Sequence, residues 1–233
     1  DAWCYNSSSE SLNANIKRSM DFYNDQRYQL SKGFIKDVEY DLTQISWTTS
    51  VLNLALKNQE ITQDKIGEKV ISLYRPFFKQ IGYYSRFWNE RVYQLPKLFP
   101  TSKYKNLVIC VKGIGDKDFS CLIVDCIPDL QVIFNGQCFP LYWYEENKNK
   151  QQTLSLFDTE SSDDYIRRDG ITDWILKEVR TRFGNARKIT KETIFYYVYG
   201  LLHSPKYREA FAADLKKSLP RIPIVEDIDA FLD

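Results

Sequence analysis

The feature that most constrains the fold is a hydrophobic pattern that changes twice along the chain. Residues 9–30 begin with serines that can cap a helix and carry apolar side chains every three or four positions, as in an amphipathic helix. From Val70 to about residue 145, the apolar residues stand in short runs rich in β-branched and aromatic types, separated by prolines and glycines, which is typical of strands and turns. Helical spacing returns after residue 164. This order predicts an α+β fold with a central, mostly antiparallel twisted sheet, N-terminal helices and a C-terminal helical packet.

The same pattern predicts the domain organisation. A second helix is expected at residues 48–59, and a polar stretch at residues 145–164 is expected to be a mobile loop or linker. Strands are expected at residues 69–77, 81–88, 106–113, 120–127 and 138–145. The predicted parts are a helical segment at 1–60, a β-rich part at 61–150 and a helical C-terminal part at 151–233.

The only histidine of the chain lies in the stretch "YYVYGLLHSPKYREAF". Apolar residues at three- and four-residue spacing predict a helix that ends at His203, and Ser204 and Pro205 suit the cap and first turn of a following helix. A histidine in the last turn meets the negative end of the helix dipole and can bond free carbonyls. We therefore expect a structural rather than a catalytic role for His203.

The charges are unevenly distributed, although the net charge is only +1. Between residues 75 and 112 the single acid is Glu90. The basic residues of this window are Arg75, Lys79, Arg86, Arg91, Lys97, Lys103, Lys105 and Lys112. Its aromatic residues are Phe77, Phe78, Tyr83, Tyr84, Phe87, Trp88, Tyr93, Phe99 and Tyr104. Cations interleaved with aromatic rings are typical of nucleic-acid surfaces, and the open alternative is a sheet with an aromatic core face and a solvated lysine face.

Several classes of chemistry lack their sequence signals. The chain has no phosphate-binding loop, no nucleophile elbow and no Asn/Asp-Pro-Pro-aromatic tetrad of the kind that holds a flipped adenine. Five cysteines without a C-x-x-C pair predict a reducing compartment and no zinc site. No apolar run approaches the roughly twenty residues of a membrane span. We expect a cytoplasmic protein without membrane partners, catalysis or a cofactor of its own, and the first residue, Asp1, suggests a fragment of a longer chain.

One pattern leaves an enzymatic alternative open. Asp129 after Pro128, followed by Glu146 and Lys148, fits the loose pattern of magnesium-dependent nucleases, in which two carboxylates hold the metal and a lysine steadies the attacking water. That chemistry needs Glu146 and Lys148 on a rigid strand, whereas they stand in the polar stretch "EENKNKQQ". The nuclease hypothesis is therefore the secondary one.

A family resemblance extends over nearly the whole chain. The motifs that carry it are, in order, "DAWCYN", "FYN", "YRPF", "NGQCFPLYWYE", "LSLFD", "YYVYGLLHSPKYREAF" and "LPRIP". They resemble the C-terminal specificity region of type ISP restriction-modification enzymes. The resemblance implies a bacterial polypeptide that joins a nuclease, a helicase-like motor, a coupler, an adenine N6-methyltransferase and this target recognition domain. The partners implied are double-stranded DNA and the methyltransferase and motor domains, and the parent chain would use S-adenosylmethionine, ATP and magnesium.

Recognition domains differ most where they touch bases, so the family motifs do not identify the residues that contact DNA. Individual contacts are therefore predicted from the charged window at residues 75–112. After "YRPF" the family pattern has an acidic residue and a basic pair, whereas this chain has Phe78, Lys79 and Gln80. The residues predicted to bind DNA are Arg75, Lys79, Arg86, Trp88, Asn89, Arg91, Lys103 and Lys105, with Tyr84 close to them. A coupling module that packs on the methyltransferase and motor without touching DNA stays open as a second alternative.

Overall fold

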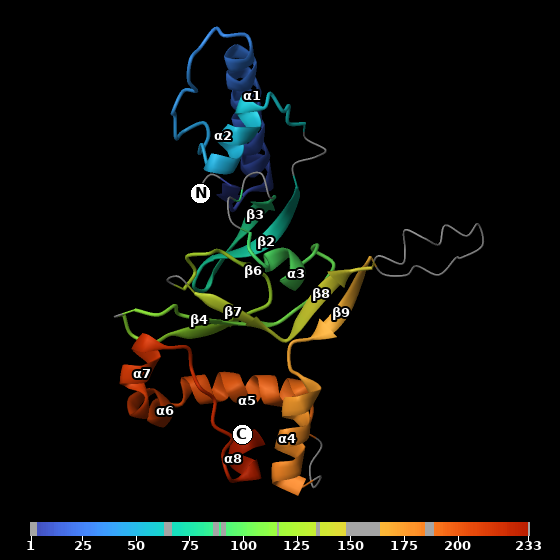
Figure 1. The fold of residues 1–233 in the computed structure, drawn as a ribbon, viewed down its shortest axis with the longest axis vertical. Helices are drawn as coiled ribbons and strands as arrows, with labels where there is room; N and C mark the ends of the chain where they lie inside the picture. The colour runs from blue at the N-terminus through green and yellow to red at the C-terminus, as the bar shows by residue number, and fades with distance from the viewer. Residues whose placement is uncertain are drawn as a thin grey trace, which may run out of the picture. The chain divides into compact units, whose positions relative to one another are not determined.

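The computed structural model describes residues 4–62, 67–85, 89, 92–115, 117–133, 136–147, 164–184 and 189–232. Contacts between residues divide the chain into two units, Asp1–Tyr93 and Gln94–Asp233. Both units have hydrophobic clusters of their own. Figure 1 shows the order of the elements from the N-terminal helices to the C-terminal ones. The three-part division expected from the sequence stays a prediction.

The first unit combines two helices with a small antiparallel sheet. Its described elements are β1 (Tyr5–Asn6), α1 (Ser9–Ser31), α2 (Thr49–Leu56), β2 (Glu68–Arg75) and β3 (Phe78–Tyr84). Ser8 caps α1, where its hydroxyl accepts the Ser11 N–H at 3.2 Å, and Thr48 caps α2 in the same way. Within this unit β3 lies between β1 and β2. Both helices expected from the sequence are confirmed, and α2 ends three residues before the predicted boundary.

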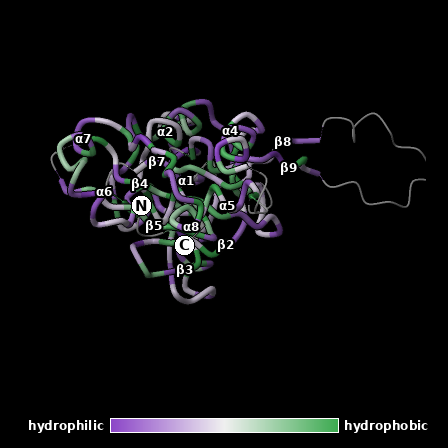
Figure 2. The backbone as a smooth tube through the Cα atoms, turned by 90° about the horizontal axis from the view of Figure 1, so that it is seen from below, coloured by the Kyte–Doolittle hydropathy of each residue, from purple (hydrophilic) through white to green (hydrophobic). Residues whose placement is uncertain are grey.

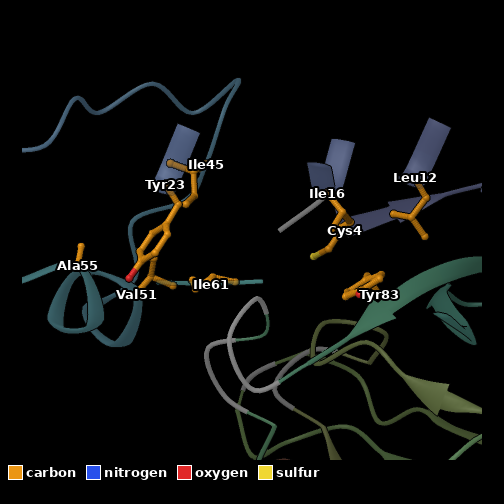
Figure 3. Close-up of a cluster of buried hydrophobic side chains, with 9 residues drawn as sticks. All are labelled: Cys4, Leu12, Ile16, Tyr23, Ile45, Val51, Ala55, Ile61 and Tyr83. Atoms are coloured by element: carbon orange, nitrogen blue, oxygen red, sulfur yellow. The ribbon is translucent and has the colours of Figure 1, made fainter. Parts of the chain in front are cut away.

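The core of the first unit forms around Tyr23 of α1. Figure 3 shows the ring of Tyr23 pointing toward α2, with Val51, Ala55 and Ile61 near it. The side chain is fully buried, and its hydroxyl donates to the Gln59 carbonyl at 2.8 Å. Burial penalises the charged phenolate and raises the pKa of Tyr23 to about 12, against a smaller opposing effect of Arg27. One side chain thus connects the first helix to the segment that follows the second.

The second unit contains two small sheets and a helical packet. Its described elements are α3 (Leu95–Leu98), β4 (Val108–Val111), β5 (Cys121–Val124), β6 (Ile127–Pro128), β7 (Gln137–Pro140), β8 (Tyr142–Glu146), β9 (Tyr165–Asp169), α4 (Asp173–Phe183), α5 (Lys191–His203), α6 (Pro205–Ala210), α7 (Ala212–Lys217) and α8 (Ile228–Leu232). In one sheet β4 lies between β5 and β7, and β8 pairs with β9 in the other, all antiparallel. All four residues of β4 are buried, which explains its continuous apolar sequence.

The buried amide of Asn106 holds three segments of the second unit together. Its Nδ2 donates to the carbonyls of Leu98 and Tyr142 at 2.9 and 2.6 Å. Its Oδ1 accepts the N–H groups of Leu107 and Tyr142 at 2.8 and 3.0 Å. These four bonds use the full capacity of an amide side chain. They fix the end of α3, the chain entering β4 and the start of β8 relative to one another.

Helix α5 has apolar side chains on two faces because it packs against two neighbours. Phe195 and Leu202 belong to the cluster that contains β4 residues such as Ile109. Ile194 and Tyr197 belong to the cluster with α4 and α8, where the ring of Tyr197 stacks on Phe231 at 4.1 Å between centroids. The wide apolar girdle in the sequence of this helix reflects these two interfaces.

The antiparallel strands expected from the sequence are present, and they form several small sheets. Only Leu141 separates β7 from β8. Its N–H donates to the Leu107 carbonyl, and its carbonyl accepts the Gly170 N–H, each at 2.7 Å. The chain therefore leaves one ladder and enters the next within one residue. The α+β class with antiparallel strands is confirmed.

Other boundaries differ for local reasons. Strand β9 was not predicted, because four of its five residues are exposed and show no alternation. The helical segment that was expected to follow Ser204 is divided at Phe211 into α6 and α7. The loop predicted at 145–164 starts within β8, and residues 148–163 lie outside the described residues. In the described part of the chain, none of the helices combines the length and apolar composition of a membrane span.

The burial of Tyr23 predicts a pH-dependent effect on stability. Its pKa is higher in the folded protein than the usual value of 10, so this contribution is present below pH 10 and is lost as the pH rises through about 12. Tyr23→Phe removes the bond to Gln59 and should lower the free energy of unfolding by about 1 kcal/mol near neutral pH. The loss of stability between pH 9 and 12 should then be smaller than in the wild type, as measured by urea unfolding.

Tyr28→Phe is the matched control, because Tyr28 lies on the same helix with about half of its surface exposed. It should change the unfolding free energy near neutral pH by less than about 0.5 kcal/mol. An equal alkaline loss in the wild type and in Tyr23→Phe would contradict the role assigned to Tyr23.

Candidate nucleic-acid interface

The β2–β3 hairpin carries two of the cations predicted to bind DNA. Arg75 ends β2 and pairs with Phe78, and Lys79 pairs with Leu73 across the hairpin. Both cationic side chains are exposed. The guanidinium of Arg75 lies 4.0 Å from the centroid of the Tyr74 ring, and its Nη1 donates to the Tyr74 carbonyl at 2.6 Å. The hairpin thus places positive charge on both sides of its turn, with one cation held against an aromatic face.

Asn89 uses its side chain within the first unit. Its Oδ1 accepts the Ser85 N–H at 2.8 Å, and its own N–H donates to the Ser85 carbonyl at 2.9 Å. Its Nδ2 lies 3.8 Å from the Cys4 sulfur. These contacts tie Asn89 to Ser85, the residue that follows β3. The predicted contacts Arg86, Trp88 and Arg91 lie outside the described residues.

Lys103 and Lys105 lie in the second unit, on the segment between α3 and β4. Both side chains are exposed, whereas the backbone around them is fixed. The Lys105 carbonyl accepts the Tyr144 hydroxyl at 2.7 Å. Between the two lysines, the ring of Tyr104 packs edge-on against Tyr144 and Tyr165 at 5.1 and 5.2 Å. Two cations therefore project from an anchored segment, as is suitable for phosphate contacts.

Lys112 differs from the other cations of the window because it is buried. Its ammonium donates to the carbonyls of Gly115 and Lys117 at 2.8 and 2.5 Å, and 5% of the residue is exposed. It holds the loop after β4 in place. Its charge stabilises the fold. The number of basic residues between 75 and 112 is therefore larger than the number of cations that can reach a ligand.

The aromatic residues of the window fall into two groups. Tyr83 and Phe99 are buried in the cores of their respective units. Phe77, Phe78 and Tyr93 are exposed, and Phe77 is exposed to 89%. The aromatic core face and the aromatic surface considered as alternatives are thus both present among these residues. Phe77 was not predicted as a site residue, although Pro76 in a short turn without glycine was a signal that could have identified it.

His203 ends α5 as predicted and belongs to a local polar cluster. Its Nε2 lies 3.3 Å from the Cys121 sulfur, and its Nδ1 lies 3.3 Å from Nη2 of Arg208. Burial lowers the pKa of His203, and the charge of Arg208 lowers it further. The carbonyl at the end of α5 that His203 was expected to bond is instead bonded by Arg208, whose Nε donates to Leu202 at 2.6 Å.

The residues of the nuclease alternative are engaged separately or exposed. The Asp129 carboxylate accepts the Gln131 N–H at 2.9 Å and closes a turn. Glu146 is exposed at the end of β8, which is hydrophilic in Figure 2. Lys148 lies outside the described residues. Among the residues that the structure describes, no group of three or more His, Cys, Asp or Glu side chains is arranged to hold a metal ion.

Comparison with known proteins places these observations in a family. The model of the Type ISP C-terminal specificity domain matches residues 1–233. The structure is similar to the ATP-dependent Type ISP restriction-modification enzyme LlaBIII bound to DNA, with a TM-score of 0.79 and 31% identity over 100% of this chain and 14% of that chain. It is also similar to DrdV in its complex with DNA, with a TM-score of 0.82 and 29% identity over 100% of this chain and 21% of that chain.

A nuclease-deletion mutant of the Type ISP enzyme LlaGI, in complex with a DNA substrate mimic, gives a TM-score of 0.76 and 30% identity, covering 100% of this chain and 16% of that chain. The chain thus spans between 14% and 21% of the length of these three proteins. No curated protein sequence matches the chain.

The burial of Lys112 predicts that its replacement affects stability and not DNA affinity. Lys112→Met keeps most of the aliphatic stem but leaves the carbonyls of Gly115 and Lys117 without this donor. It should lower the free energy of unfolding by about 1 to 3 kcal/mol and leave DNA affinity within about threefold of the wild type. The exposed Lys103→Met is the control, with an expected stability change under about 0.5 kcal/mol. A loss of DNA affinity at wild-type stability in Lys112→Met would refute this assignment.

Proposed function

Because this chain belongs to the Type ISP C-terminal specificity domain family, we propose that it recognises a specific sequence in double-stranded DNA. In this proposal it selects the site at which other domains of the same polypeptide methylate and cleave. The observation that carries the proposal is the family match over residues 1–233. The similar structures of LlaBIII, DrdV and the LlaGI mutant are all complexes with DNA or a DNA mimic, which supports DNA as the ligand.

The proposed division of labour assigns recognition to this chain and chemistry to other domains. S-adenosylmethionine, ATP and magnesium would act in the methyltransferase, motor and nuclease domains of the longer polypeptide. Because such an enzyme acts on DNA inside the cell, we place the protein in the bacterial cytoplasm. The partners of this chain would be duplex DNA and the methyltransferase and motor domains.

We assign the described cations different roles according to their surroundings. Lys103 and Lys105 would contact phosphates, because both are exposed on a fixed backbone. Arg75 and Lys79 would bind DNA from the turn end of the β2–β3 hairpin, which presents both exposed cations. The side-chain Oδ1 of Asn89 accepts the Ser85 N–H, so a bidentate contact of this amide to adenine would compete with that bond. Arg86, Trp88 and Arg91 stay predicted contacts.

The phosphate role of Lys103 and Lys105 predicts a characteristic effect of salt. Each lysine replaced by alanine should weaken binding to every duplex and reduce the slope of log affinity against log salt by about 0.9. Lys17→Ala is the control, because Lys17 is exposed on α1 and pairs with Asp21 at 2.5 Å. Fluorescence anisotropy at several salt concentrations measures both quantities.

Wild-type slopes in both lysine variants would place the phosphate contacts elsewhere, with the segment from Arg167 to Lys191 the next to test. A wild-type chain that does not bind DNA would favour the coupling-module alternative. Cleavage of DNA by the chain only when magnesium is added would favour the nuclease alternative.

A further inference from the structure

The turn of the β2–β3 hairpin has an unusual sequence for its conformation. Arg75 pairs with Phe78, so Pro76 and Phe77 form a two-residue turn. Phe77 has a φ of +62°, a left-handed conformation that is uncommon for a bulky residue. Two-residue hairpin turns use glycine, asparagine or aspartate at such positions. A phenylalanine therefore occupies a position where glycine would relieve the backbone.

Packing of the Phe77 side chain does not offset the free-energy cost of its left-handed backbone conformation. It is exposed to 89%, and its neighbour Phe78 is exposed to 49%. An aromatic ring gains free energy mainly when its surface is removed from water. Neither the geometry of the turn nor packing in the core of the first unit explains a phenylalanine at position 77. Strained residues that persist in a fold are found at ligand-binding sites.

The surroundings of Phe77 fit a negatively charged ligand with flat apolar surfaces. Arg75 precedes the turn and Lys79 follows Phe78, so exposed cations flank the two rings. The pairing register shifts between Leu73 and Arg75, and such bulges redirect side chains at the end of a strand. DNA offers this combination, with phosphates outside and the faces of base pairs between them.

We propose that Phe77 is a wedge that inserts between base pairs of duplex DNA, while Arg75 and Lys79 contact the flanking phosphates. This inference rests on the proposed function and specifies how one hairpin contributes to it. Apolar side chains that insert at a base step unstack it and kink the duplex. Pyrimidine–purine steps unstack most readily. Phe77 therefore contributes to target choice through the deformability of DNA, without a hydrogen bond to a base.

The test compares Phe77→Gly with the wild type in the chain of residues 1–233. Glycine suits a positive φ, so this variant should fold with equal or higher stability. Phe34→Ala is the matched control, because Phe34 is another phenylalanine of the first unit and is exposed to 71%. The probe is a duplex that the wild-type chain selects from a random pool. Anisotropy measures affinity, and energy transfer between dyes at the duplex ends measures bending.

Phe77→Gly should bind about 5- to 100-fold more weakly, in line with the contribution of one aromatic stacking contact, and it should bend the duplex less. Phe77→Tyr, which keeps a stacking ring, and Phe34→Ala should stay within about threefold of wild-type affinity. Wild-type affinity and bending in Phe77→Gly would overturn the wedge while leaving DNA recognition intact. A wild-type chain that binds without bending the duplex would also overturn it. Failure of the wild type to bind any duplex would overturn the proposed function itself, and the wedge with it.

Discussion

The candidate interface of the second unit depends on the buried amide of Asn106. Its four hydrogen bonds join the end of α3, the entry to β4 and the first residue of β8. An unpaired amide at this depth is costly, so the three segments are constrained together. Lys105 stands directly before Asn106, and Lys103 stands two residues earlier. A residue that never reaches a ligand thus fixes the segment from which two cations project.

In the first unit, the β2–β3 hairpin is held in place by strand pairing and packing. The hairpin is short, but β3 lies between β1 and β2, and Tyr83 of β3 packs in the cluster that contains Leu12 and Ile16 of α1. Val70 and Tyr83 near the base of the hairpin are thereby buried, whereas its turn is exposed. Recognition elements are often built in this way, with variable residues presented by a rigid scaffold. The same logic explains why a strained residue such as Phe77 is tolerated at the turn.

The sequence predicted the elements whose pattern is local. The helix at Ser9–Ser31, the end of α5 at His203 and the cap at Ser204 follow from spacing and capping residues, and they were confirmed. The division into separate sheets was not predictable, because it depends on long-range bonds of Leu141 and Asn106. Among the basic residues between 75 and 112, charge alone did not distinguish the buried Lys112 from the exposed Lys103. Burial depends on tertiary contacts that a charge pattern does not contain.

The central claim is that this chain binds DNA through the hairpin and the segment before β4. Hydrogen exchange of residues 1–233, with and without a selected duplex, tests it most directly, because amides covered by a ligand exchange more slowly. The account predicts slower exchange in the bound state at residues 73–80 and 101–106, with little change in α1 and α8. Slower exchange confined to residues 164–203, with the hairpin unchanged, would contradict it.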